Sequence, residues 1–235
     1  MNEYSLKYKK IISHILKYGV EQDCRNGKQL IIPFYNFNLD FSVENNWKLN
    51  LRKINYKPIK GEFLTLIDKN NPLTNVNQFK KNGCNYWDQW AKDNYLNLDY
   101  YNMLHPQLEL IINQIKKDPY SRRHVIELWN YKNVFSNKLS LPCCWHNLTF
   151  TIIKNNIFMS FSLRSNDIMI GNPADTYLAF LFHSYVAKKT NYQIALCNFN
   201  ILNPHIYKEH VKNAQILLKR TEKDFDKHLY FKLKK

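Results

Sequence analysis

Two neighbouring cysteines and a few arginines are the residues of this chain whose chemistry is most informative. Cys143 and Cys144 are the candidates for a nucleophile, because a thiolate in an electropositive, partly exposed site attacks electrophilic carbon readily. Arginine is rare here, with six among the 34 basic residues. Its planar five-donor fork binds phosphate in a bidentate way that lysine does not reproduce. Four arginines fall in loop-like or strand-end contexts and together predict an anion site: Arg25, Arg122, Arg123 and Arg164.

Length and composition predict one folded domain over residues 1–235. Of the 235 residues, 45% are hydrophobic and 15% aromatic, so the chain can bury a large core without disulfides. Five cysteines, an odd number without C-x-x-C spacing, predict neither a disulfide framework nor a zinc site, and no metal is expected. A signal-peptide core and a membrane-spanning apolar run are both lacking, which predicts a cytoplasmic protein, in the host cytoplasm if viral.

The charge balance is strongly basic, with 34 Lys and Arg residues against 19 Asp and Glu and a formal net charge of +15. Such a charge is typical of proteins that bind nucleic acid. Lysine and asparagine are abundant throughout, however, as an AT-rich genome would produce, and the lysines form no long block interleaved with stacking aromatics. We therefore expect no dedicated nucleic-acid function and no membrane partner.

The hydrophobic pattern predicts both helices and strands as the elements that position these residues. Helices are predicted over 3–18, 60–67, 107–117, 173–189 and 206–220. Strands are predicted over 30–37, 39–43, 124–129, 148–154, 156–163 and 192–202. Between the first helix and the first strand, residues 21–29 are predicted to form a polar loop, and Asn155-Asn156 a hairpin turn, which favours an antiparallel sheet. With no repeat and no linker, the predicted class is α+β.

Five segments together carry a resemblance to a known family. HILKYGVEQDCRNG, KKDPYSRRHVIELWN, a cysteine before a strand, LRSNDIMIGNPAD and PHIYKEH occur in the order and spacing of the thymidylate synthase family, which includes pyrimidine hydroxymethylases. The chain resembles that family from about residue 8 to about residue 215. The resemblance implies a large mixed or antiparallel sheet with surrounding helices and a homodimer whose sheets face each other. It also implies a pyrimidine nucleoside monophosphate as substrate and 5,10-methylenetetrahydrofolate as co-substrate.

The resemblance also implies which residues hold the nucleotide. The phosphate-binding positions of one subunit match Arg25, Arg164 and Ser165. Arg122 and Arg123 match the pair that reaches the phosphate from the partner subunit. The positions that bind the sugar hydroxyl match His205 and Tyr207.

A second group of positions is implied to serve the folate and the proton transfers. Glu62 matches the glutamate that organises water near the pyrimidine. Tyr101 matches an active-site tyrosine, although its neighbours depart from the family pattern. The folate-binding positions match Trp87, Trp90, Leu141, Asp167 and Gly171, with Asp167 contacting the pterin.

Spacing within the resemblance distinguishes the two cysteines. In the family, the reactive cysteine lies 20 residues before the phosphate-binding arginine, and 164 minus 20 gives Cys144. Cys143 then takes the place of the preceding proline. The positions after the cysteine and before the arginine hold Trp145 and Leu163 instead of histidine and glutamine, so polar groups expected of a strict synthase are missing.

The most informative departure lies 11 residues past Arg164, where thymidylate synthases place an asparagine and this chain has Asp175. The asparagine pairs with the N3 donor and O4 acceptor of uracil, whereas cytosine presents an N3 acceptor and an N4 donor. A carboxyl group complements cytosine by accepting from N4, with a proton shared at N3. The same aspartate marks the deoxycytidylate (dCMP) hydroxymethylases with which bacteriophages make modified DNA precursors. The expected catalytic set is therefore Cys144, Glu62, Asp175 and Tyr101.

Three alternatives stay open at this point. The chain is a thymidylate synthase or a dUMP hydroxymethylase with an unusual base contact, a hydroxymethylase of ribonucleotides such as CMP, or a nucleic-acid-binding protein on an inactive synthase scaffold. The sequence does not show how the sugar 2′ position is treated.

Overall fold

The computed structural model describes residues 1–68, 76–91, 93, 96, 99–130, 141–227, 229 and 231. Its α-helices are α1 (Glu3–Tyr18), α2 (Tyr56–Leu66), α3 (Val76–Lys81), α4 (Asp99–Lys117), α6 (Gly171–Thr190) and α7 (Val211–Lys219). Its strands are β1 (Val20–Cys24), β2 (Gly27–Ile31), β3 (Tyr35–Asp40), β4 (Val125–Glu127), β5 (Trp145–Ile153), β6 (Asn156–Leu163), β7 (Asn166–Asp167), β8 (Gln193–Ile201) and β9 (Pro204–Tyr207). Short 3₁₀ helices are η1 (Tyr86–Trp90), η2 (Lys208–His210) and η3 (Glu222–Asp224). The α+β prediction is confirmed.

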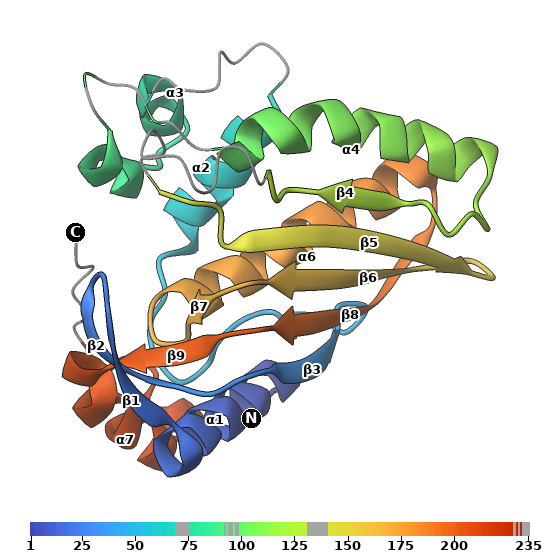
Figure 1. The fold of residues 1–235 in the computed structure, drawn as a ribbon. Helices are drawn as coiled ribbons and strands as arrows, with labels where there is room; N and C mark the ends of the chain where they lie inside the picture. The colour runs from blue at the N-terminus through green and yellow to red at the C-terminus, as the bar shows by residue number, and fades with distance from the viewer. Residues whose placement is uncertain are drawn as a thin grey trace.

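The strands form two sheets, with order β3-β8-β6-β5-β4 in the larger and β1-β2-β9-β7 in the smaller. β5 and β6 are an antiparallel hairpin, as predicted, but its turn residues are Lys154 and Asn155, one position earlier than expected. β4 and β5 are also antiparallel, so the antiparallel arrangement predicted for these three strands is confirmed. β6 and β8 pair in parallel, which makes the larger sheet mixed. The long helix α6 connects them and runs behind the sheet in Figure 1, as parallel neighbours require a crossover connection.

One face of the larger sheet carries the core. On β8 the side chains alternate, so Cys197, Phe199 and Ile201 are buried while the residues between them are not. Phe199 stacks on Phe37 of β3 with ring centroids 4.7 Å apart. α6 covers this face and is buried along most of its length, as its largely apolar sequence predicts.

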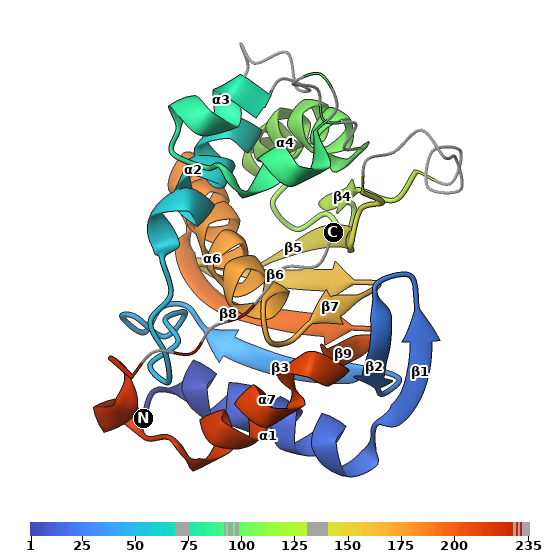
Figure 2. The same ribbon diagram turned by 90° about the vertical axis from the view of Figure 1, so that its left-hand side faces the viewer.

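Helix α1 spans the predicted residues, but its buried face differs from the one that its aliphatic residues suggest. Leu6 is 47% exposed, whereas Tyr4 and Tyr8 are buried and continue the stripe of Ile11 and Ile15. Each phenol finds a hydrogen-bond partner inside the protein, which makes burial of a tyrosine favourable. Helices α1 and α7 lie side by side below the sheets (Figure 2).

The predicted polar loop at 21–29 is instead the β1–β2 hairpin, with pairs from Val20↔Ile31 to Cys24↔Gly27. Both faces of β1 are largely exposed to water, so its residues show no hydrophobic alternation that could have revealed a strand. Arg25 and Asn26 form the turn, and Gly27 supplies a φ of 108° that other residues adopt rarely. The hairpin therefore presents Arg25 at its tip.

The four predicted helices after the first have different starting points, with α2 beginning at Tyr56 and α6 at Gly171. The last one begins at Val211, because residues 204–207 form β9 and pair with β2. α4 begins at Asp99 and continues through Pro106, since its buried stripe of Leu104, Leu108 and Ile115 extends before the proline. These shifts place Tyr207 on a strand beside the hairpin.

Candidate active site

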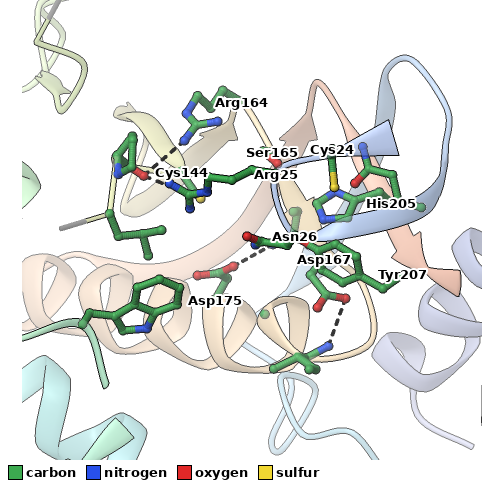
Figure 3. A pocket seen from close by; sticks show the side chains of 17 residues that line it. Cys24, Arg25, Asn26, Cys144, Arg164, Ser165, Asp167, Asp175, His205 and Tyr207 are labelled. Carbon is green, nitrogen blue, oxygen red and sulfur yellow. Dashed lines mark hydrogen bonds between the residues drawn. The ribbon is translucent and has the colours of Figure 1, made fainter. Parts of the chain in front are cut away.

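A cavity of about 480 Å³ lies between the β1–β2 hairpin, the end of β6 and the start of α6. Figure 3 shows how residues from these separate elements face it. Its lining includes seven of the predicted nucleotide-binding and catalytic residues: Arg25, Cys144, Arg164, Ser165, Asp175, His205 and Tyr207. The fold thus brings together residues that are up to 182 positions apart, from Arg25 to Tyr207.

A second cavity, of about 440 Å³, adjoins the first and shares Cys144 and Asp175 with it. Its walls are mainly apolar and include Trp87, Trp90 and Leu178. Flat aromatic walls suit a planar ring, and the predicted folate residues divide between the two spaces. Trp87 lines the second cavity and Asp167 lines the first. The residues that line both cavities are Trp90, Leu141 and Gly171.

The two cysteines differ sharply in their surroundings. Cys143 is fully buried, and its Sγ donates to the Trp145 carbonyl at 3.1 Å. Cys144 lines both cavities. Burial raises the pKa of the Cys144 thiol, while the positive charges of Arg164 and Arg25 act to lower it. Only Cys144 is placed to meet a substrate.

Arg164 holds the loop that carries these cysteines. Its Nε donates to the Cys143 carbonyl at 2.7 Å, and Nη2 donates to the Pro142 carbonyl at 3.1 Å. The guanidinium also lies over the Trp129 ring, 5.5 Å from its centroid. Two of the donor groups are thus used internally. Arg164 also lines the cavity, where its other N–H groups can bind an anion.

Asp175, in the second turn of α6, accepts two hydrogen bonds from rigid donors. Oδ1 accepts from Trp145 Nε1 at 2.8 Å, and Oδ2 accepts from Asn166 Nδ2 at 2.6 Å. Burial raises the pKa of Asp175 to about 7, and both hydrogen bonds oppose the rise because they favour the carboxylate. Replacement of histidine by Trp145 therefore supplies a new donor, a role that the sequence analysis missed.

Glu62 on α2 is buried, and its carboxylate accepts from Trp87 Nε1 at 3.1 Å and from the Tyr86 hydroxyl. Burial raises the pKa of Glu62 to about 7, and the donation from Tyr86 opposes the rise. Next to Glu62, Gly61 lets the backbone at Asn82 pack closely against α2, because a Cβ at residue 61 would lie 2.2 Å from the Asn82 carbonyl oxygen. The sequence analysis did not identify Tyr86.

Asp167, His205 and Tyr207 complete the wall opposite Cys144. The Asp167 carboxylate accepts from the backbone N–H of Met169 at 2.9 Å, and burial raises its pKa. Burial lowers the pKa of His205, whose Nδ1 lies 3.1 Å from the Asn203 carbonyl oxygen. A neutral imidazole and a phenol are suitable partners for a sugar hydroxyl.

Two predicted residues do not join this site in one chain, and a third lies where its side chain is not described. Arg122 and Arg123 are exposed in the turn between α4 and β4 and line neither cavity. Tyr101 falls within α4, and its side chain lies outside the described residues. Among the side chains that are described, no group of three His, Cys, Asp or Glu residues is arranged to hold a metal. In the same part of the chain, no helix is long and apolar enough to cross a membrane.

Comparison with known proteins gives the family of the chain. The family described as Thymidylate synthase matches residues 6–234. A thymidylate synthase of Bacillus mojavensis is 25% identical over 246 aligned positions, which cover 94% of this chain and 86% of that protein. A thymidylate synthase of Bacillus phage phi3T is 27% identical over 187 positions, which cover 74% of this chain and 65% of that protein.

The chain belongs to the thymidylate synthase family. It is a thymidylate synthase-like enzyme, a one-carbon transferase, and thymidylate synthases use methylenetetrahydrofolate as co-substrate. The second cavity, which is apolar, lined by tryptophans and next to Cys144, is of a kind that fits the planar ring of a folate.

Proposed function

We propose that the chain is a deoxycytidylate 5-hydroxymethyltransferase, which forms 5-hydroxymethyl-dCMP from dCMP, 5,10-methylenetetrahydrofolate and water. The observation that carries this proposal is the position of Asp175 beside Cys144, with two internal donors on its carboxylate. One lone pair on each oxygen is left for the base. Two adjacent acceptors suit the N4 amino group and a proton shared at N3 of cytosine, and they oppose O4 of uracil.

In the proposed reaction, the Cys144 thiolate adds to C6 of the pyrimidine, and C5 becomes a carbon nucleophile. The co-substrate supplies the one-carbon unit, which C5 attacks. Loss of the C5 proton and departure of tetrahydrofolate leave an exocyclic methylene on the pyrimidine. Water then adds to this carbon, and the bond between C6 and the thiolate breaks to restore the aromatic ring. No hydride is transferred, so the folate leaves as tetrahydrofolate.

Glu62 is proposed to direct the water. It lines the second cavity together with Cys144 and Asp175, on the side away from the arginines. The Tyr86 hydroxyl and Trp87 Nε1 fix the carboxylate, so an oxygen lone pair stays available to a water molecule or to the C5 proton. A pKa near 7 suits a group that takes and returns protons at neutral pH.

Substrate binding is proposed to depend on the first cavity and on a partner subunit. Arg25, Arg164 and Ser165 would bind the phosphate, and His205 and Tyr207 the sugar hydroxyl. The proposed homodimer is supported by the sheet face opposite α6. That face carries Thr149, Thr151, Ser160 and Asn198 and a 39% exposed Leu196, and it is hollowed by a cavity of about 290 Å³.

A shared site predicts complementation between two defective variants. Cys144→Ala lacks the nucleophile, and Arg123→Ala lacks the arginine proposed to serve the partner's phosphate. When the two proteins are mixed under conditions of subunit exchange, hybrid dimers contain one intact site, and activity should return. Absence of activity in hybrids purified with two different affinity tags, or a monomeric wild type in sedimentation, would contradict the shared site.

A thymidylate synthase that methylates dUMP is the second candidate. It is favoured by the names of the relatives, which are thymidylate synthases. The two candidates differ in the base that Asp175 must recognise, which is cytosine in the first and uracil in the second. An aspartate in place of the family's asparagine changes the hydrogen bonds offered to that base.

Asp175→Asn tests the proposed function. The amide presents N–H to O4 and a carbonyl to N3–H, so preference should move from dCMP towards dUMP. A buried donor–acceptor mismatch costs roughly 1–3 kcal/mol, about 5- to 150-fold in the ratio of the two kcat/KM values. Steady-state kinetics with both nucleotides measure this ratio. A wild type that prefers dUMP, or an unchanged ratio in the variant, would contradict the assignment.

A further inference from the structure

A chain of buried side chains leads from helix α1 to Asp175. Tyr4 Oη donates to Asn172 Oδ1 at 2.9 Å, Asn172 Nδ2 donates to Asn166 Oδ1 at 2.8 Å, and Asn166 Nδ2 donates to Asp175 Oδ2 at 2.6 Å. Tyr4, Asn172 and Asn166 are 0%, 1% and 3% exposed. We call this chain of residues Tyr4, Asn172 and Asn166 the relay. It lies outside the set of residues that the proposed chemistry uses.

The relay has a direction, and Asp175 sets it. A carboxylate only accepts, so the amide of Asn166 must turn its Nδ2 towards Asp175 and its Oδ1 towards Asn172. Asn172 must then turn its Oδ1 towards Tyr4, whose hydroxyl donates. On the other side of Asp175, the indole of Trp145 can only donate. Both oxygens of Asp175 are therefore held by donors from the protein, and neither amide can flip without leaving a buried group unpaired.

We propose that Asn166, oriented by Asn172 and Tyr4, is a positioning residue that holds Asp175 as an acceptor-only carboxylate and thereby sets the base preference of the enzyme. This inference rests on the proposed reading of cytosine by Asp175. With both oxygens acting as acceptors, the proton shared with the base lies towards cytosine N3. A proton at N3 draws electron density from C6 and assists addition of the thiolate, so the relay contributes to turnover as well as to selection.

Two tyrosines on the same helix provide a matched pair for the test. Tyr4→Phe removes the first donor of the relay. Tyr8→Phe removes an equally buried hydroxyl, which donates to the Ile168 carbonyl at 2.8 Å and is outside the relay. Each change deletes the hydrogen bond that a buried hydroxyl donates, so both variants should lose thermal stability to a similar extent. Only Tyr4→Phe should change the ratio of kcat/KM for dCMP to kcat/KM for dUMP.

The expected changes in that ratio are graded along the relay. Asn166→Leu, next to Asp175, should lower it on the order of tenfold, and Tyr4→Phe by about two- to fivefold. For dCMP, kcat/KM should fall because kcat decreases more than KM rises, since the proton held at cytosine N3 also assists addition of the thiolate. Tyr8→Phe should leave the ratio unchanged.

The outcomes separate this inference from the proposed function. A wild type that prefers dUMP would overturn both. A wild type that prefers dCMP, with the same ratio in Asn166→Leu and Tyr4→Phe, would overturn the relay and leave the proposed function standing. Equal ratios in Tyr4→Phe and Tyr8→Phe, both reduced, would assign the effect to general destabilisation and overturn the relay as well. If Asn166→Leu fails to fold, the comparison of the two phenylalanine variants decides.

Discussion

Cys144→Ala should abolish turnover. The proposed reaction begins with a bond from this sulfur to C6, and without it C5 is not nucleophilic enough to attack the one-carbon unit. The loss should be roughly 10⁴-fold or more in kcat, a scale found when a covalent nucleophile is removed. Single-turnover assays with dCMP and methylenetetrahydrofolate measure it, and nucleotide binding should be retained.

The neighbouring cysteine provides the control. Cys143 is fully buried and turns its sulfur towards the Trp145 carbonyl, so Cys143→Ala should cost stability and leave catalysis largely intact. If Cys143→Ala is the inactive variant while Cys144→Ala turns over, the assignment of the nucleophile is wrong.

Glu62→Gln should give the second large effect, a loss of roughly 10²- to 10⁴-fold in kcat with a small change in KM for dCMP. The amide keeps the shape of the side chain and its contact with Trp87 but cannot take a proton. Glu44→Gln, at an exposed glutamate that lines neither cavity, is the matched control and should behave as wild type. Wild-type turnover by Glu62→Gln would exclude a role in proton transfer.

The same carboxylate predicts a pH dependence. Because the pKa of Glu62 is raised to about 7 and the ionised form directs water, kcat should fall as pH decreases below about 7. Cys144 and Asp175 also lose their ionised forms towards low pH, so the wild-type profile alone does not identify the group. Tyr86→Phe does, since removal of this donor disfavours the Glu62 carboxylate and should move the acid limb to higher pH. An unmoved limb would show that Glu62 does not control it.

Local pattern was sufficient for some elements of the fold and insufficient for others. The apolar run of α6 and the β5–β6 hairpin follow from sequence, because burial and the turn act over neighbouring residues. The β1–β2 hairpin was missed because both faces of β1 are largely exposed to solvent, so its polar residues show no hydrophobic alternation. The parallel pairing of β6 with β8 is a contact across a crossover, which no local pattern encodes.

The site shows the same division. The motifs implied that Arg25, Cys144, Arg164 and Asp175 belong together, and the fold places them around one cavity. Partners that hold the reacting groups were not predicted. In the sequence Trp145 only removed a polar group, whereas in the fold its indole N–H, at the start of β5, donates to Asp175 on α6.

The remaining partners depend on tertiary contacts. Tyr86 reaches Glu62 because Gly61 lets the backbone at Asn82 approach closely. Tyr4 was overlooked because tyrosine is a common surface residue, and only the position of Asn172 shows what its hydroxyl binds. Hydrogen bonds between residues far apart in sequence are set by the packed fold rather than by spacing.

Product analysis of the wild-type reaction tests the central claim most directly. The enzyme is incubated with dCMP and methylenetetrahydrofolate in water labelled with a heavy oxygen isotope, and the nucleotide is identified by mass while dihydrofolate absorbance is followed. The account predicts dCMP that carries one added hydroxymethyl group with the label in its oxygen, and no rise in dihydrofolate. An unlabelled methyl product formed in step with dihydrofolate, or turnover of dUMP alone, would contradict it.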